Sequence, residues 1–180
     1  MMRDDGINAM FTDLNRMRTG LLEQLAAMPS DDLIRKPGPG RWTQLQVVEH
    51  LVLSEREVLQ GLPASAGLVP QKRSPLNLVS YAIVLFILKW DIPVPPPSSK
   101  MVPCGRIPFN ELREMWDRNF KWLGDTIAAL GAGAARLAVF RHPVAGPLTP
   151  FQALRMDRLH LESHIRQINR IQRLLENQNT

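Results

Sequence analysis

The sequence predicts an all-α fold, a four-helix bundle, and three observations lead to this prediction. Apolar residues recur at spacings of three and four along four long segments, which is the period of amphipathic helices. Two of those segments begin with a helix-capping pattern. No segment shows a competing strand pattern. The 180 residues fit a single domain, residues 1–180, which is large enough to bury a core without disulfides.

The first helix is expected over residues 6–28 and ends before Pro29, which cannot continue it. Its apolar residues at helical spacing are Ile7, Met10, Phe11, Leu14, Met17, Leu21, Leu25 and Met28. A short turn is expected at residues 30–33. The segment Pro37-Gly38-Pro39-Gly40 then forbids regular structure and predicts a connector.

The second helix is expected over residues 43–62, because Thr43 and Gln46 have the spacing of a capping box. In this pattern the threonine side chain accepts from the amide three residues on, and the glutamine side chain reaches back. The stripe at core-facing spacing is Val47, His50, Leu51, Ser54 and Val58. His50 is therefore predicted to face the interior.

Residues 63–108 are the least regular part of the sequence. Within them, residues 76–90 form an apolar stretch of 15 residues, short of the ~20 that span a bilayer. We expect a packed helix here, with contact to a membrane surface or a partner as the alternative. The prolines of residues 92–99 favour an extended path. So long a connection is typical of a lid or binding loop, and it is expected to shape a substrate pocket.

The third helix is expected over residues 110–130, with Gly131 as its C-terminal stop. The fourth begins at Thr149-Pro150-Phe151-Gln152, which places a threonine at the cap and a proline at the first helical position. It is expected to run to residue 176. Its inward stripe is Met156, Asp157, His160, Leu161, His164, Ile168, Ile171 and Leu175.

The net charge of +5 comes from 22 Lys plus Arg against 17 Asp plus Glu. Without aromatic platforms or a reading motif beside the basic residues, we expect no nucleic-acid partner. Part of the charge is an arginine stripe on the last helix, expected to be a solvated face: Arg155, Arg158, Arg166, Arg170 and Arg173.

The single cysteine, Cys104, excludes an internal disulfide framework and agrees with a reducing compartment. No neighbouring base or helix cap in the sequence favours a reactive thiol there. The N-terminus carries acids early and lacks an unbroken apolar region, so it does not resemble a signal peptide. A cytoplasmic location is therefore expected.

Three of the four histidines can converge on one point. His160 and His164 are four residues apart on a helix and share a face, and His50 lies on the inward face of another helix. Three neutral imidazoles with an open fourth position are typical of a catalytic rather than a structural zinc-type site. The alternative is that these histidines are buried and satisfied by hydrogen bonds, which is the commoner fate of an isolated pair.

Other polar residues near these histidines in the sequence are candidates for supporting the site. Glu162 lies roughly 200° round the helix from the histidine pair, so it is not expected to be a base there. Asp157, one turn before the pair, is a candidate acceptor that orients an imidazole, and Gln46 is another unless it serves the cap. His142 is expected to have a loop or cap role. Trp42 is expected to be a packing anchor, with the pocket mouth as the alternative.

Two motifs of the chain resemble the DinB-like (YfiT-like) metal-dependent family. The first runs from Gly40-Arg41-Trp42-Thr43 to His50-Leu51, where the family has a tryptophan, a hydroxylated residue and a first histidine ligand. The second is residues 142–149, His-Pro-Val-Ala-Gly-Pro-Leu-Thr, followed by His160 and His164 in the places of the family's paired histidines. The resemblance extends from the first helix to residue 172.

This resemblance implies a left-handed up-down-down-up bundle, frequent homodimers, and a zinc or nickel ion on His50, His160 and His164. Known members include bacillithiol S-transferases and mycothiol-dependent isomerases. The expected function is therefore a metal-dependent enzyme for a small-molecule substrate, either a transferase that uses a low-molecular-weight thiol or a hydrolase. The alternative is a non-enzymatic bundle that binds a ligand or partner. The apolar segment 76–90 with its prolines departs from the family pattern and leaves the substrate open.

Overall fold

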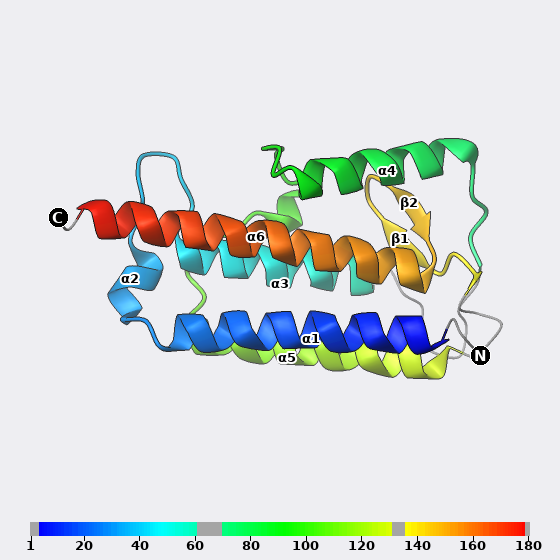
Figure 1. Cartoon of the computed structure of the whole chain (residues 1–180), viewed down its shortest axis with the longest axis horizontal. Coiled ribbons are helices and arrows are strands. Elements are labelled where there is room, and N and C mark those ends of the chain that lie inside the picture. Colours follow the sequence, from blue (N-terminus) through cyan, green and yellow to red (C-terminus); the bar gives the residue numbers. More distant parts are fainter. Residues whose placement is uncertain (1–3, 61–69, 131–135, 179–180) are drawn as a thin grey trace.

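The computed structural model describes residues 4–60, 70–130 and 136–178, and their architecture is all-α. Four long helices form the bundle: α1 (Asp4–Ala26), α3 (Gln44–Gln60), α5 (Phe109–Ala129) and α6 (Pro150–Gln178). α1 packs on α5 and α6, and α3 packs on the same two helices (Figure 1). The predicted fold class is confirmed. The expected ends at residues 62 and 131 lie outside the described residues.

Figure 1 shows that α1 and α6 run in one direction and that α3 and α5 run in the other. The core between them is built from the aliphatic stripes of all four helices, together with Trp116 and Phe120 of α5. One residue of each long helix is completely buried, at 0% exposure, and so lies at the centre of the core: Leu25, Val48, Leu112 and Ile168. The left-handed topology that the family resemblance implies stays a prediction.

Three short elements correct the expectations from the sequence. The expected turn after the first helix is a five-residue helix, α2 (Ser30–Ile34). The segment before α6 contains a hairpin of two short antiparallel strands, β1 (Phe140–His142) and β2 (Gly146–Leu148), where no strand was expected. Gly146 has a φ of +74°, and a Cβ there would lie 2.5 Å from the Asn77 side chain. A glycine is therefore required where the hairpin meets the helix Pro75–Lys89, α4.

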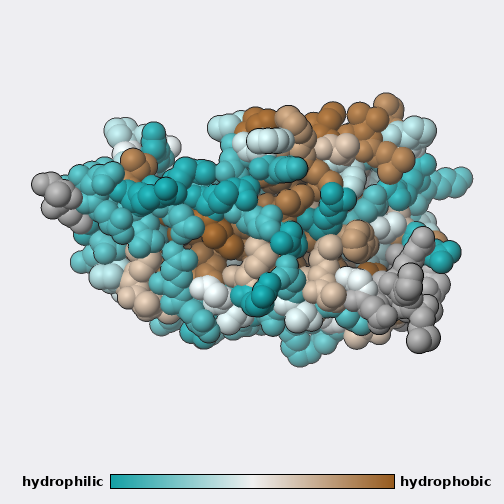
Figure 2. All heavy atoms as spheres, in the orientation of Figure 1, coloured by the Kyte–Doolittle hydropathy of each residue, from teal (hydrophilic) through white to brown (hydrophobic). Residues whose placement is uncertain are grey.

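A further helix, α4 (Pro75–Lys89), lies outside the bundle against α6 and β2. The proline-rich segment and the short helix η1 (Ser99–Met101) follow it. We name residues 75–101 the roof. The expectation that residues 76–90 form a packed helix holds for one face only, because the other face is exposed, and its apolar atoms gather over α4 in Figure 2.

No helix within residues 4–60, 70–130 and 136–178 combines the length and the hydropathy that crossing a bilayer requires.

Candidate metal centre

The first helix of the site is positioned by its cap. The Gln46 amide donates to Thr43 Oγ1 over 3.1 Å, and the Thr43 amide donates to Gln46 Oε1 over 3.0 Å, so the predicted capping box is confirmed. Helical geometry then turns His50 toward the interior, where it is 6% exposed. Gln46 serves this cap and is not an orienting acceptor for the imidazoles.

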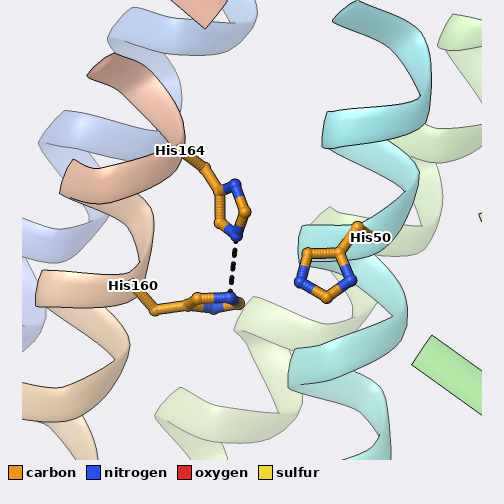
Figure 3. A group of neighbouring side chains, drawn as sticks. All are labelled: His50, His160 and His164. Atoms are coloured by element: carbon orange, nitrogen blue, oxygen red, sulfur yellow. Dashed lines mark hydrogen bonds between the residues drawn. The ribbon is translucent and has the colours of Figure 1, made fainter. Parts of the chain in front are cut away.

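The second helix of the site begins in the same way. The Thr149 amide donates to Gln152 Oε1 over 3.1 Å, and the Gln152 amide donates to Thr149 Oγ1 over 3.3 Å. This fixes the start of α6. His160 and His164, one turn apart, then project from the same face of α6 toward α3 (Figure 3).

The three imidazoles meet between α3 and α6. The ring centre of His50 lies 5.3 Å from that of His160 and 4.9 Å from that of His164, and the latter two centres are 4.6 Å apart. One nitrogen of each ring lies within 4.8 Å of the others. The Nε2 atoms of His160 and His164 are 3.0 Å apart. The structure therefore brings together the three residues that the sequence singled out.

Hydrogen bonds on the far side of two rings set their tautomers. His50 Nδ1 donates to the carbonyl oxygen of Met101 over 2.7 Å, and His164 Nδ1 donates to Gln167 Oε1 over the same distance. Because each Nδ1 carries the proton, the Nε2 atom of each ring carries a lone pair. This arrangement, an outer acceptor behind a ligating histidine, is typical of metal sites.

Burial keeps the three histidines neutral. Desolvation lowers the pKa of His50, and the hydrogen bond to Met101 only partly opposes it. Burial, followed by the nearby rings, holds the pKa of His160 well below its usual range and lowers that of His164 to about 4. Neutral imidazoles at pH 7 are the form that can bind a metal.

The donor set fits a divalent cation. Two imidazoles on one zinc ion lie about 3.3 Å apart at their nitrogens, close to the separation of the His160 and His164 Nε2 atoms. Three imidazole donors suit zinc and nickel, and they leave room for a further ligand. With no ion bound, His160 Nε2 can donate its proton to the lone pair of His164 Nε2 over 3.0 Å, and loss of that one proton would give the ion its third imidazole lone pair.

The histidines line a cavity of about 930 Å³ beneath the roof. Its walls are mostly apolar and come from α3, α6 and the hairpin on one side and from Val84, Ile87, Leu88 and the prolines 93–97 on the other. Trp42 is also in the wall, and its ring centre lies 5.1 Å from that of His50. The tryptophan therefore both packs on His50 and borders the cavity. The predicted contribution of the middle segment to a pocket is confirmed.

A pair of half-buried acids borders the same cavity, and sequence reasoning missed one of them, Glu55. Burial raises the pKa of Glu55 well above its usual range, and the nearby Asp157 raises it further. Burial also raises the pKa of Asp157 to about 7. One oxygen of Glu55, Oε2, is buried without a hydrogen-bond partner. The two carboxyls therefore hold a proton near neutral pH. The sequence did contain a sign that Glu55 faces inward, because it lies four residues from Leu51 and four from Leu59, on the same side of the helix.

An ion-pair cluster fastens the roof to α6. Asp91, just after α4, accepts hydrogen bonds at Oδ1 from Arg166 Nη2 and Ser163 Oγ, each over 2.7 Å, and from Arg166 Nε over 3.2 Å. Arg170 Nη1 donates to Asp91 Oδ2 over 2.9 Å. Asp91 has a φ of +51°, an uncommon conformation for a residue with a side chain. The expected solvated arginine stripe is therefore wrong in part, because Arg166 and Arg170 bind the roof.

The remaining candidates have structural roles. Glu162 pairs with Arg158 over 2.8 Å, and Arg158 also pairs with Asp13 of α1, so Glu162 lies away from the histidines, as its helical phase predicted. His142 Nδ1 accepts from the amides of Val144 and Ala145 over 3.1 and 3.0 Å, so the expected cap role is confirmed, although the ring also borders the cavity.

Cys104 also has a structural setting. Its amide and thiol both donate to Glu49 Oε1, over 3.0 and 3.1 Å, and the Gly105 amide donates to Glu49 Oε2 over 2.7 Å. Glu49 is 1% exposed, so these bonds satisfy a buried carboxylate. They hold the segment after η1 on α3, next to the Met101 carbonyl that orients His50.

Comparison with known proteins gives one match. The family model described as the DinB superfamily matches residues 13–168, which is most of the chain and includes all three histidines. No curated protein and no solved structure matches the chain.

Proposed function

The chain belongs to the DinB superfamily, and from this premise we propose that it is a divalent-metal-dependent enzyme with zinc or nickel on His50, His160 and His164. One observation carries the proposal. Met101 and Gln167 hold the Nδ1 protons of His50 and His164, so the Nε2 atoms of both rings carry lone pairs, and one nitrogen of each of the three rings lies within 4.8 Å of the others.

The reaction we propose is thiol-dependent transfer or metal-assisted hydrolysis. A bound divalent ion would supply Lewis acidity, which lets a thiol or water lose its proton near neutral pH. Glu55 and Asp157 line the same cavity and have raised pKa values, so they are candidates for accepting that proton or returning it. The apolar walls exclude water and strengthen each of these interactions.

The cavity supports a small-molecule substrate with a substantial apolar part. Its volume of about 930 Å³ accommodates a drug-sized molecule. Four further parts of the proposal rest on the sequence. They are a low-molecular-weight thiol as second reactant, a single domain over residues 1–180, a homodimer and a cytoplasmic location.

Metal content of the purified protein tests the site. We expect about one zinc or nickel ion per chain in the wild type and a loss of at least about tenfold in affinity in His50→Ala and His164→Ala. His142→Ala is the matched control, because this histidine borders the same cavity but caps a turn. A wild type that cannot be loaded with either metal, or a His142→Ala that loses it, would contradict the ligand set.

The apolar cavity also suits a second function, a non-enzymatic bundle that binds a ligand or partner. Turnover distinguishes the two. The metal-loaded protein is incubated with electrophilic substrates and a panel of low-molecular-weight thiols, and product is measured against Glu55→Gln. Product formation that requires the metal supports the enzyme, whereas ligand binding without turnover favours the binding protein.

A further inference from the structure

The outer face of α4 is a continuous apolar surface. Five large side chains form it at helical spacings of three and four, and each is more than half exposed: Leu76, Val79, Ile83, Phe86 and Trp90. Single exposed apolar residues are ordinary, but a contiguous patch marks a surface that meets another body. Figure 2 shows this patch above the rest of the molecule. We name it the outer face.

Rotation of α4 cannot bury the outer face, because the opposite face is already in use. Val84, Leu85 and Leu88 pack against the bundle core, and Tyr81 is buried. Asp91 fixes the end of the helix through Arg166 and Arg170. The helix is therefore apolar on both faces, and only one face is covered within the described residues.

The charges around the outer face have one sign. Lys72 and Arg73 precede α4 and Lys89 ends it, and all three are exposed, whereas Lys100, after the proline-rich segment, pairs with Glu57 over 3.4 Å. The only acid of residues 70–107 is Asp91, which is held by the arginines of α6. Lys89 lies 5.8 Å from the ring centre of Trp90, so a cation and an indole stand together at the edge of the patch.

We propose that the outer face docks on a bilayer surface that contains anionic lipid, with α4 in the plane of the headgroups. A helix of 15 residues is about 22 Å long, which is too short to cross a bilayer but suits a helix that lies in the plane of the headgroups. Exposed cations attract anionic headgroups, and tryptophan and lysine favour the boundary between apolar and wet layers.

A second copy of the chain is the less suitable occupant. Helices that pair through a row at spacings of three and four usually flank it with opposite charges. The only charged residue of α4 is Lys89, so two such faces would bring like charges together with no acid to pair them. The nearest acid, Asp91, is already neutralised by α6.

Vesicle binding of the full-length protein tests the proposal. Flotation and tryptophan fluorescence are measured with vesicles of phosphatidylcholine alone and with about one-third phosphatidylglycerol. We expect binding to the anionic vesicles, weakening with salt, and a blue shift of the fluorescence. Ile83→Glu and Phe86→Glu should each weaken binding by about tenfold or more. Ile34→Glu is the matched control, because Ile34 on α2 is 56% exposed, as Phe86 is 57% exposed.

Light scattering and metal content of every variant complete the test. Equal metal content and helical circular dichroism show that the variants are folded, and they keep this test separate from that of the three-histidine site. Absence of vesicle binding overturns the proposal. Vesicle binding that Ile83→Glu and Phe86→Glu leave unchanged overturns it too. A dimer that these variants dissociate, with no vesicle binding by the wild type, assigns the face to a second copy instead.

Discussion

The bundle and the roof close on the same cavity but are held by different forces. In the bundle, each long helix buries a row of aliphatic side chains, and His164 is held from behind by Gln167 of its own helix, whereas the acceptor behind His50 is Met101 of the roof. Within the roof, all of which is described, Tyr81 and Met101 are the buried residues. The roof depends instead on the charge cluster at Asp91. The comparison suggests that the reactive groups sit on the stable half and that access depends on the weaker half.

The largest expected effect is a difference in stability loss between a leucine removed from the bundle and one removed from the roof. Leu112 of α5 is 0% exposed, so Leu112→Ala should lower the free energy of unfolding by about 2–5 kcal/mol. Leu85 on the inner face of α4 is only partly buried, so Leu85→Ala should cost about 1 kcal/mol. Urea denaturation followed by circular dichroism measures both. Equal losses would mean that the roof is as deeply packed as the bundle.

The next effect is a pH-dependent change in stability that arises from the pair of acids, Glu55 and Asp157. The folded pKa of Asp157, about 7, is above the ordinary value of 3.8, so folding binds a proton between these values and stability falls as pH rises through them. Asp157→Asn removes the ionisation. At about pH 8 it should raise the free energy of unfolding by roughly 1–3 kcal/mol, and at about pH 4 the gain should vanish.

Urea denaturation at the two pH values measures this prediction. Asp125→Asn on the surface of α5 is the control, because its exposed pair with Lys121 should leave stability nearly unchanged at both. A destabilised Asp157→Asn at high pH would show that the carboxylate is ionised and paired in the fold, which would place the shared proton elsewhere.

The smallest expected effect is local to the roof. Arg166 beside Asp91 holds the pKa of that carboxyl below its usual range, so the attachment is complete above about pH 4 and is lost as pH falls through the lowered folded value. Asp91→Asn should cost about 1 kcal/mol overall. It should speed amide hydrogen exchange in residues 75–92 by about tenfold and leave α5 unchanged, as measured by mass spectrometry. Faster exchange throughout the bundle would contradict a separable roof.

Helical periodicity in four segments predicted the bundle, and two helix caps predicted the direction of the three histidines. Thr43 and Thr149 mark where α3 and α6 begin, and a helix of known start has a known phase at every later residue. The inward direction of His50, His160 and His164 followed from that phase. What brings the two helices face to face is the packing of the whole bundle, which the family resemblance anticipated and local pattern did not.

The features that the sequence did not predict share a different cause, because each of them depends on contacts with residues far away in the chain. Strands of three residues are too short for alternation to be visible, so the β1–β2 hairpin was missed. Arg166 resembled a solvated residue because its partner, Asp91, is 75 residues away. For α4, both faces are apolar, and periodicity cannot tell which of them a neighbour covers.

The two capping threonines also limit how the chain can change in length. Seven residues separate Thr43 from His50 and eleven separate Thr149 from His160, close to two and three full turns of helix. Each cap therefore lies on the same side of its helix as the histidine it places. One residue inserted between them would swing that histidine by about 100°, off the cavity, although every ligand would still be present. Along these two stretches, the chain can tolerate exchanges of side chains far more readily than a change in the count of residues.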